Sequence, residues 1–103
     1  MEKMQESFFL KYLGNNPKMR ILNFLMDNFA HDFSLPQIAG GSKVAYTTLI
    51  DILPQLLKQE MIMETRKIGK SRLYKINLDS PIAKALFVID MKLSEAAIEK
   101  VMA

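Results

Sequence analysis

The chain has 103 residues, of which 50% are hydrophobic and 24% charged, a composition typical of one globular domain rather than of a disordered segment. It contains no cysteine, which excludes disulfides and thiolate metal sites. The longest apolar run, residues 85–89, is far too short to span a membrane, so the default expectation is a soluble cytoplasmic protein.

The net charge of +3 is unevenly distributed. Residues 58–75 carry six cations against two glutamates, whereas the rest of the chain is close to neutral. The six cations are Lys58, Arg66, Lys67, Lys70, Arg72 and Lys75. A basic loop on a neutral body is typical of a surface that contacts phosphates, although an ordinary solvated hairpin explains the charge equally well.

Two helices are predicted in the first third of the chain. Apolar residues recur at helical spacing over residues 2–12, and Gly14 ends this pattern. Asn16 and Pro17 are preferred at the N-cap and first position of a helix, which predicts where the second one begins. An apolar stripe follows and predicts a helix that ends near residues 28–31. The stripe consists of Ile21, Leu22, Leu25, Met26 and Phe29.

The segment that begins at Phe33 has the signature of a helix start. Ser34 and Gln37 are spaced as a capping box, in which each side chain bonds the backbone amide of the other residue. Phe33 and Ile38 occupy the flanking positions of a hydrophobic staple. The glycine pair at 40–41 predicts that this helix is short, because glycine favours a helix C-terminus.

A longer helix is predicted over residues 45–60, after Val44 has turned inward. One face of this helix is apolar and is expected to pack on the preceding helices. The residues of this face are Ala45, Leu49, Ile52, Leu53 and Leu56. The outer face carries Tyr46, Thr47, Ile50, Asp51 and Lys58.

Two strands are predicted over residues 61–68 and 71–78, joined by a turn at Gly69 and Lys70. A short helix, a turn, a longer helix and a basic hairpin follow one another in this order in an α+β winged helix-turn-helix, which has a three-helix core and a hairpin wing. The winged-helix domain is therefore expected over residues 1–80, the N-terminal helix included.

Ser80 and Pro81 predict the start of a final helix over residues 81–103, which would extend about 34 Å. Its apolar stripe is longer than a small domain needs, which favours a dimerisation helix, although packing on its own domain explains the stripe too. The stripe consists of Ile82, Ala85, Leu86, Ile89, Leu93, Ala96 and Val101. The residues expected at the dimer interface are Ile82, Leu86, Ile89, Leu93 and Ala97.

An enzyme is poorly supported. The chain has one histidine, no glycine-rich phosphate loop and no carboxylate cluster at metal-ligand spacing. His31 is expected at a helix end, facing solvent, without a catalytic partner. No cofactor and no metal site are expected.

Double-stranded DNA is the partner that the predicted fold favours. A helix fits the major groove, and the side chains at its N-terminal end reach base edges. A basic wing contacts phosphates or enters the minor groove. The turn and the helix offer Lys43, Tyr46, Thr47, Thr48, Ile50 and Asp51, and the hairpin offers Arg66, Lys67, Lys70, Ser71 and Arg72. For Thr47, Thr48, Lys70 and Arg72 an ordinary solvated surface is the alternative.

Four stretches, residues 33–39, 44–49, 53–58 and 65–77, resemble the small archaeal winged-helix transcriptional regulators, which are distantly similar to the MarR and ArsR groups. The similarity spans about residues 8–90. It implies a dimeric DNA-binding protein whose recognition helix begins near Ala45. The chain departs from the family pattern at Lys43, where glycine is usual, and at Ala45, where a capping serine is usual. Metal ligands of the ArsR type are absent from the sequence.

The sequence therefore predicts a sequence-specific double-stranded DNA-binding protein, a transcriptional regulator that acts as a homodimer. Two alternatives stay open, because a fold does not fix a function. One is a winged-helix module for protein interaction, which the apolar C-terminal stripe and the lack of arginine in the recognition helix favour. The other is a non-specific architectural DNA-binding module.

Overall fold

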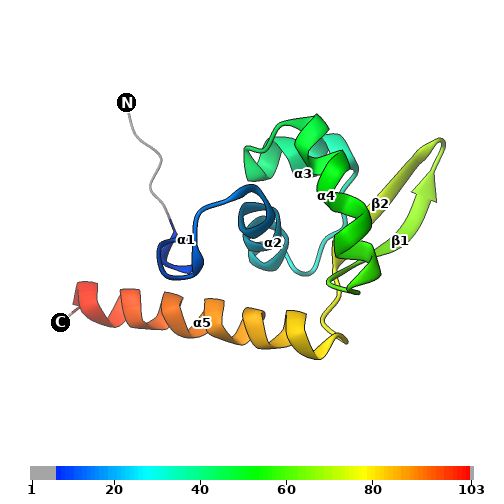
Figure 1. Cartoon of the computed structure of the whole chain (residues 1–103). Helices are drawn as coiled ribbons and strands as arrows, with labels where there is room; N and C mark the ends of the chain where they lie inside the picture. The colour runs from blue at the N-terminus through cyan, green and yellow to red at the C-terminus, as the bar shows by residue number, and fades with distance from the viewer. Residues whose placement is uncertain (1–6, 103) are drawn as a thin grey trace.

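The computed structural model describes residues 7–102, which form five helices and a two-stranded antiparallel sheet. The elements are α1 (Phe8–Leu13), α2 (Pro17–Asp27), α3 (Leu35–Ser42), α4 (Tyr46–Lys58), β1 (Ile62–Ile68), β2 (Ser71–Ile76) and α5 (Pro81–Met102). Figure 1 shows α2, α3 and α4 grouped together, with the hairpin beside α4 and α5 along the opposite side. The fold is the predicted α+β winged helix-turn-helix with a long C-terminal helix.

The predicted N-caps are confirmed by hydrogen bonds. The Oδ1 atom of Asn16 accepts the N–H of Met19 at 2.9 Å. At the start of α3, the backbone N–H of Ser34 donates to Oε1 of Gln37 at 2.9 Å, and the N–H of Gln37 donates to Oγ of Ser34 at 3.4 Å. These two bonds form the capping box. At the start of α5 the hydroxyl oxygen of Ser80 accepts the N–H of Ala83 at 3.4 Å, which is a single N-cap bond.

Several helix boundaries lie away from their predicted positions, and α4, predicted over residues 45–60, runs over Tyr46–Lys58. Helix α1 begins at Phe8, and the predicted part at residues 2–6 lies outside the described residues. Helix α2 ends at Asp27, one residue before the predicted range. Differences of this size are expected at helix ends, which fray.

The prediction that the glycine pair at 40–41 ends α3 is wrong. The helix continues to Ser42, and Lys43 takes the left-handed conformation at the C-cap, with φ at 59°. Gly41 has a different role, because a Cβ at this position would overlap the ring of Phe24 on α2. The missing side chain therefore lets α2 and α3 approach closely.

The core lies where α1 to α4 and β2 meet. Its largest fully buried side chains are Phe9, Ile21, Leu22, Leu25, Met26, Ile38, Leu49, Leu56 and Ile76. Val44 is buried as predicted. The prediction that Ala45 joins the packed face of α4 is wrong: Ala45 is the N-cap and is exposed, because the helix begins one residue later.

The hairpin is attached to the helical core at its base. Phe33, just before α3, pairs with Tyr74 on β2, and each backbone N–H donates to the other residue's carbonyl at 2.8 Å. The register of the hairpin shifts between Glu64 and Arg66, which leaves Thr65 as a β-bulge. The bridge at Phe33 fixes where the wing stands relative to α3.

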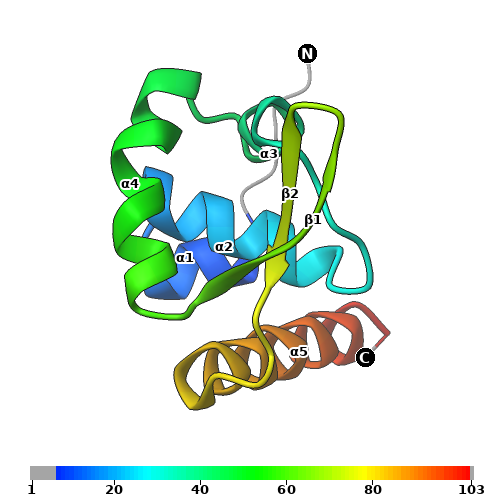
Figure 2. The same cartoon turned by 90° about the vertical axis from the view of Figure 1, so that its right-hand side faces the viewer.

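Helix α5 packs against α1 and α2 with one face. Ala83 is fully buried, and Leu86 and Phe87 pack against the core. Figure 2 shows α5 at the end of the molecule opposite the hairpin tip. Part of the C-terminal helix therefore packs on the winged-helix core of the same chain.

Candidate nucleic-acid interface

The first turn of α4 and the tip of the hairpin lie at the same end of the molecule, away from α5 (Figures 1 and 2). They also line one open groove together with the start of α3. The residues of this groove are Ser34, Leu35, Pro36, Tyr46, Lys70, Ser71, Arg72 and Tyr74. The structure thus brings together side chains that the sequence placed in two separate candidate sets.

The candidate residues of α4 lie mostly on its outer face. Tyr46 is 49% exposed and Ile50 is 39% exposed, and Thr47 and Asp51 are also exposed. Thr48 is half-buried, which limits its reach. Four of the five candidates on this helix are therefore accessible at its N-terminal end, the part that enters a major groove in helix-turn-helix proteins.

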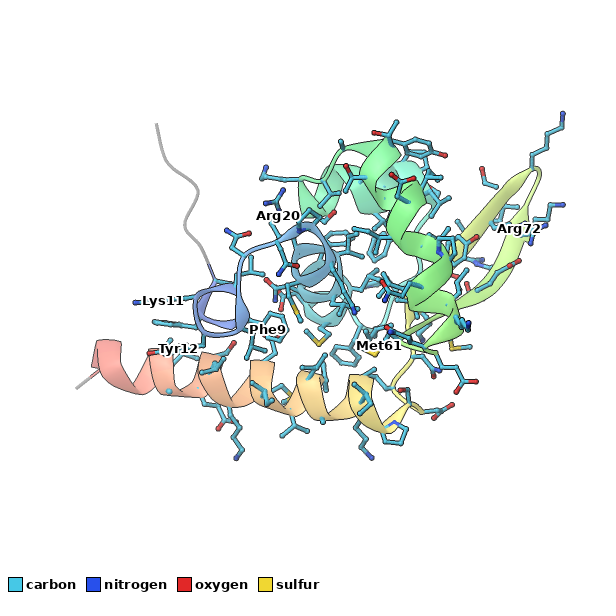
Figure 3. The ribbon with its side chains drawn as sticks, viewed as in Figure 1. Phe9, Lys11, Tyr12, Arg20, Met61 and Arg72 are labelled. Atoms are coloured by element: carbon cyan, nitrogen blue, oxygen red, sulfur yellow. The ribbon has the colours of Figure 1, made fainter. Side chains whose placement is uncertain are left out.

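The turn before α4 is held by Arg20, a residue that sequence reasoning missed. The guanidinium of Arg20 donates from Nε to the carbonyl of Ser42 at 3.3 Å and from Nη2 to the carbonyl of Lys43. Figure 3 shows Arg20 extending from α2 at the level of this loop. These bonds satisfy carbonyls at the end of α3 and leave the Lys43 side chain exposed.

The wing keeps two lysines accessible and pairs its arginines. Lys67 and Lys70 are exposed near the tip. Arg72, labelled in Figure 3, donates from Nη1 to Glu64 at 3.2 Å, and the two side chains are 58% and 38% exposed. An exposed pair of this kind contributes about 0–1 kcal/mol, so a phosphate can replace the carboxylate at little cost.

Arg66 is held more firmly, by Asp32. Its Nε and Nη2 atoms donate to the two carboxylate oxygens at 3.0 and 3.2 Å, and the hydroxyl of Thr65 donates to the same carboxylate. The Arg66 guanidinium and the Thr65 hydroxyl lower the pKa of Asp32 to about 2. Asp32 is therefore ionised at neutral pH and offsets one positive charge of the wing.

The predicted dimer residues of α5 divide between two environments. Ile82 is 62% exposed and Ile89 is exposed. Leu86 packs against the core of its own chain, and Leu93 and Ala97 are half-buried along the same helix. Helix α5 thus combines a face that packs inward with an outer face that carries uncovered apolar side chains.

Two further side chains connect α5 to α2, and neither was singled out from the sequence. The carboxyl groups of Asp27 on α2 and Asp90 on α5 share a hydrogen bond. Burial and the neighbouring Asp27 raise the pKa of Asp90 to about 7, so Asp90 holds a proton at mildly acidic pH. The sequence did contain an indication that Asp90 is buried, because Asp90 lies one helical turn after Leu86 on the stripe that packs inward.

The described residues contain no group of three or more His, Asp or Glu side chains arranged to hold a metal ion. Within that same part of the chain, no helix is both long and apolar enough to cross a membrane.

No protein-family model and no curated protein matches this chain. The solved structures that match its fold include the following three. NadR in complex with 4-hydroxyphenylacetate has a TM-score of 0.66 at 16% identity, over 92% of this chain and 68% of that chain. MepR, a transcription regulator of the Staphylococcus aureus multidrug efflux pump MepA, has a TM-score of 0.61 at 12% identity, over 90% and 70%. Sso10a-2, a DNA-binding protein from Sulfolobus solfataricus, has a TM-score of 0.55 at 19% identity, over 84% and 94%.

These similarities establish the winged-helix fold. They do not transfer a ligand or a target, because identities below 20% leave the side chains of a site free to differ.

Proposed function

We propose that this chain is a transcription regulator that binds double-stranded DNA as a homodimer. The observation that carries the proposal is the shared groove, in which Tyr46 of α4 and Lys70 and Arg72 of the wing stand at one end of the molecule. A helix start beside a basic loop matches a major groove flanked by its phosphates. Because the target is DNA, the proposed place of action is the cytoplasm.

The proposed division of roles follows the chemistry of the side chains. Tyr46, Thr47 and Ile50 offer a hydroxyl pair and an apolar contact to base edges, whereas Lys67 and Lys70 offer charge to phosphates. No arginine or asparagine stands on the outer face of this helix start to make a bidentate contact with a base. We therefore expect moderate sequence preference on top of substantial non-specific affinity.

A second copy is proposed to pack on the outer face of α5. Exposed apolar side chains occur along the described helix at Ile82, Val88, Ile89, Met91 and Ile98, of which Ile82 and Ile89, seven residues apart, share one side. Apolar side chains left uncovered in this way are the kind that an interface between two copies would bury. In a symmetric dimer the two recognition helices would lie about 34–36 Å apart, one turn of DNA, on a palindromic site.

Fluorescence anisotropy with a labelled duplex tests the proposal. If each subunit engages three to four phosphates, log affinity should fall with log salt at a slope of about −5 to −7. A duplex from upstream of the protein's own gene should bind more tightly than a random duplex. Equal affinity for both would instead favour an architectural protein, and no binding at low salt would refute DNA binding.

The second candidate function is a protein-interaction module, and the uncovered face of α5 favours it. A gel-shift assay with genomic fragments separates the two functions. Retention of a discrete fragment supports a regulator, whereas a dimer that retains none supports the interaction module.

A further inference from the structure

Asp51 is an acidic side chain on the surface that we propose faces DNA. It lies in the second turn of α4 and is exposed. Asp32 and Glu64 each pair with an arginine of the wing, whereas none of the ion pairs among the described residues involves Asp51. The helix positions three and four residues away hold no cation either: Thr47, Thr48, Pro54 and Gln55. Asp51 therefore presents a carboxylate that the described part of the chain does not neutralise.

The side of α4 that carries Asp51 points away from the core. Successive residues of a helix are about 100° apart, so Asp51 lies roughly opposite the fully buried Leu49. Ile50 is 39% exposed and lies between Asp51 and Tyr46, which lines the groove beside the wing. Figure 2 shows α4 at an outer edge of the molecule, with the other described helices on its inner side. Ile50 and Asp51 are therefore both accessible on the outer face of this helix.

A carboxylate on such a surface repels the phosphates of DNA. Only a hydrogen-bond donor on a base can offset this repulsion, and in the major groove cytosine N4 and adenine N6 are the donors. Adenine N6 lies beside the acceptor N7 of the same base, which repels a carboxylate oxygen, whereas cytosine N4 has no such neighbour on its own base. Guanine presents two acceptors there. A carboxylate therefore favours cytosine and disfavours guanine.

Ile50 offers a contact of a different kind. Its apolar side chain cannot bond a donor or an acceptor, but it can pack against the methyl group of thymine in the major groove. Because Ile50 and Asp51 are adjacent and about 100° apart around the helix axis, they face different base pairs of one site. A thymine close to the cytosine would therefore match both side chains.

We propose that the half-site read by α4 contains a cytosine, whose N4 donates to Asp51, and a nearby thymine, whose methyl group contacts Ile50. This inference rests on the proposed function, because it assumes that α4 enters the major groove. The repulsion between Asp51 and phosphates lowers the affinity for every sequence, and only a site with the cytosine offsets it. Asp51 thus acts as a specificity-determining residue that also works against wrong partners.

Selection of tight binders from a randomised duplex pool tests the base preference. The natural chain should enrich a site with a cytosine. Asp51→Asn should enrich adenine at the same position, because an amide bonds both N6 and N7 of adenine. Asp79→Asn removes an exposed carboxylate outside α4 and should leave the enriched site unchanged. A site without cytosine, or one that Asp51→Asn leaves unchanged, overturns the inference.

Asp51→Ala separates the base contact from a general effect of charge. Its affinity for the enriched duplex should fall about tenfold, because the cytosine donor loses its acceptor. Its affinity for a random duplex should rise severalfold at low salt, because the repulsion of phosphates is removed. Fluorescence anisotropy measures both affinities. A rise for both duplexes would show that Asp51 only repels DNA and would overturn the contact with cytosine.

Deoxyuridine in place of the thymine tests Ile50, since it differs from thymidine only by the missing methyl group. The natural chain should bind the substituted duplex about fourfold more weakly. Ile50→Ala should bind both duplexes equally, because it lacks the apolar atoms that contact the methyl group. Equal binding of both duplexes by the natural chain overturns the role of Ile50.

This inference and the proposed function fail in different ways. Tight binding of duplex DNA with no base preference overturns the inference and leaves DNA binding intact. Absence of duplex binding at low salt overturns both. Because Ile50 and Asp51 are exposed, their variants should keep the fold, which circular dichroism of each variant checks.

Discussion

The carboxylate of Asp32 receives two hydrogen bonds from the guanidinium of Arg66, at 3.0 Å from Nε and at 3.2 Å from Nη2. Asp32 lies in the segment before α3, and Arg66 lies just after the bulge in β1. The pair therefore joins the wing to the helical core at a second place, beside the backbone bridge between Phe33 and Tyr74. It also removes a positive charge from the surface that we propose faces DNA.

Replacement of Asp32 by asparagine should strengthen non-specific DNA binding. The change frees the Arg66 guanidinium for a phosphate, so affinity for a random duplex should rise severalfold. The salt slope should steepen by about 0.9 for each additional phosphate that the variant neutralises. Anisotropy across a salt series measures both, with Asp79→Asn as the control for loss of one negative charge. A lower affinity at an unchanged slope would show that Asp32 serves only to position the wing.

Substitutions in the wing and in α4 should affect DNA binding differently. Lys70→Ala combined with Arg72→Ala should weaken binding to all sequences and reduce the salt slope by about 0.9 for each phosphate that the variant leaves unneutralised. Tyr46→Ala or Thr47→Ala should instead change the preferred sequence, because these side chains are proposed to reach base edges. Competition binding with a randomised duplex pool distinguishes the two outcomes. Identical effects of both sets on specific and random DNA would contradict the assignment.

The two glycines of α3 should respond in opposite directions to alanine. Gly41→Ala places a methyl group against the Phe24 ring and should destabilise the fold by about 1–3 kcal/mol. Gly40→Ala is the matched control, since its Cβ meets open space, and it should stabilise the helix by about 0.5–1 kcal/mol. Urea unfolding followed by circular dichroism measures both. Equal effects would mean that Phe24 does not pack on Gly41.

The thermal stability of the protein should fall as the pH rises from 5 to 8. Asp90 has its folded-state pKa raised to about 7, so its contribution is complete below the unfolded value near 4 and is lost as the pH passes through 7. The loss should be about 1–3 kcal/mol, less than the full shift implies because Asp27 shares the titration.

The variant Asp90→Asn tests the origin of this pH dependence. Its amide stays neutral and can still donate to Asp27, so the melting temperature should stay nearly constant over the same pH range. Asp79→Asn should retain the decline. A decline of equal size in Asp90→Asn would assign the effect to another group.

The outer face of α5 should control the oligomeric state. Ile82→Lys combined with Ile89→Lys should yield monomers at concentrations where the natural chain is dimeric, because charges then replace exposed apolar side chains. Sedimentation equilibrium measures the change, with Lys84→Gln on the same helix as the control. A monomeric natural chain would refute the dimer outright.

The order of elements was predictable because it depends on local signals. The capping box at Ser34 and Gln37, the N-cap at Asn16 and the turn at Gly69 act over a few residues, and the structure confirms each of them. The glycine pair at 40–41 misled the prediction, because glycine both ends helices and admits a close neighbour. Only the position of Phe24 on another helix decides which role applies.

The sequence alone determined the winged-helix order, the buried stripes and the excess of positive charge on the hairpin, since periodicity and charge are properties of neighbouring residues. Only the tertiary structure decided that Tyr46 shares a groove with Lys70 and Arg72, that Asp32 holds Arg66, and that Asp90 of α5 lies against Asp27 of α2. These arrangements join residues far apart in the chain or depend on how three helices pack. Local propensity carries no information about them, because packing of the whole core sets which distant side chains meet.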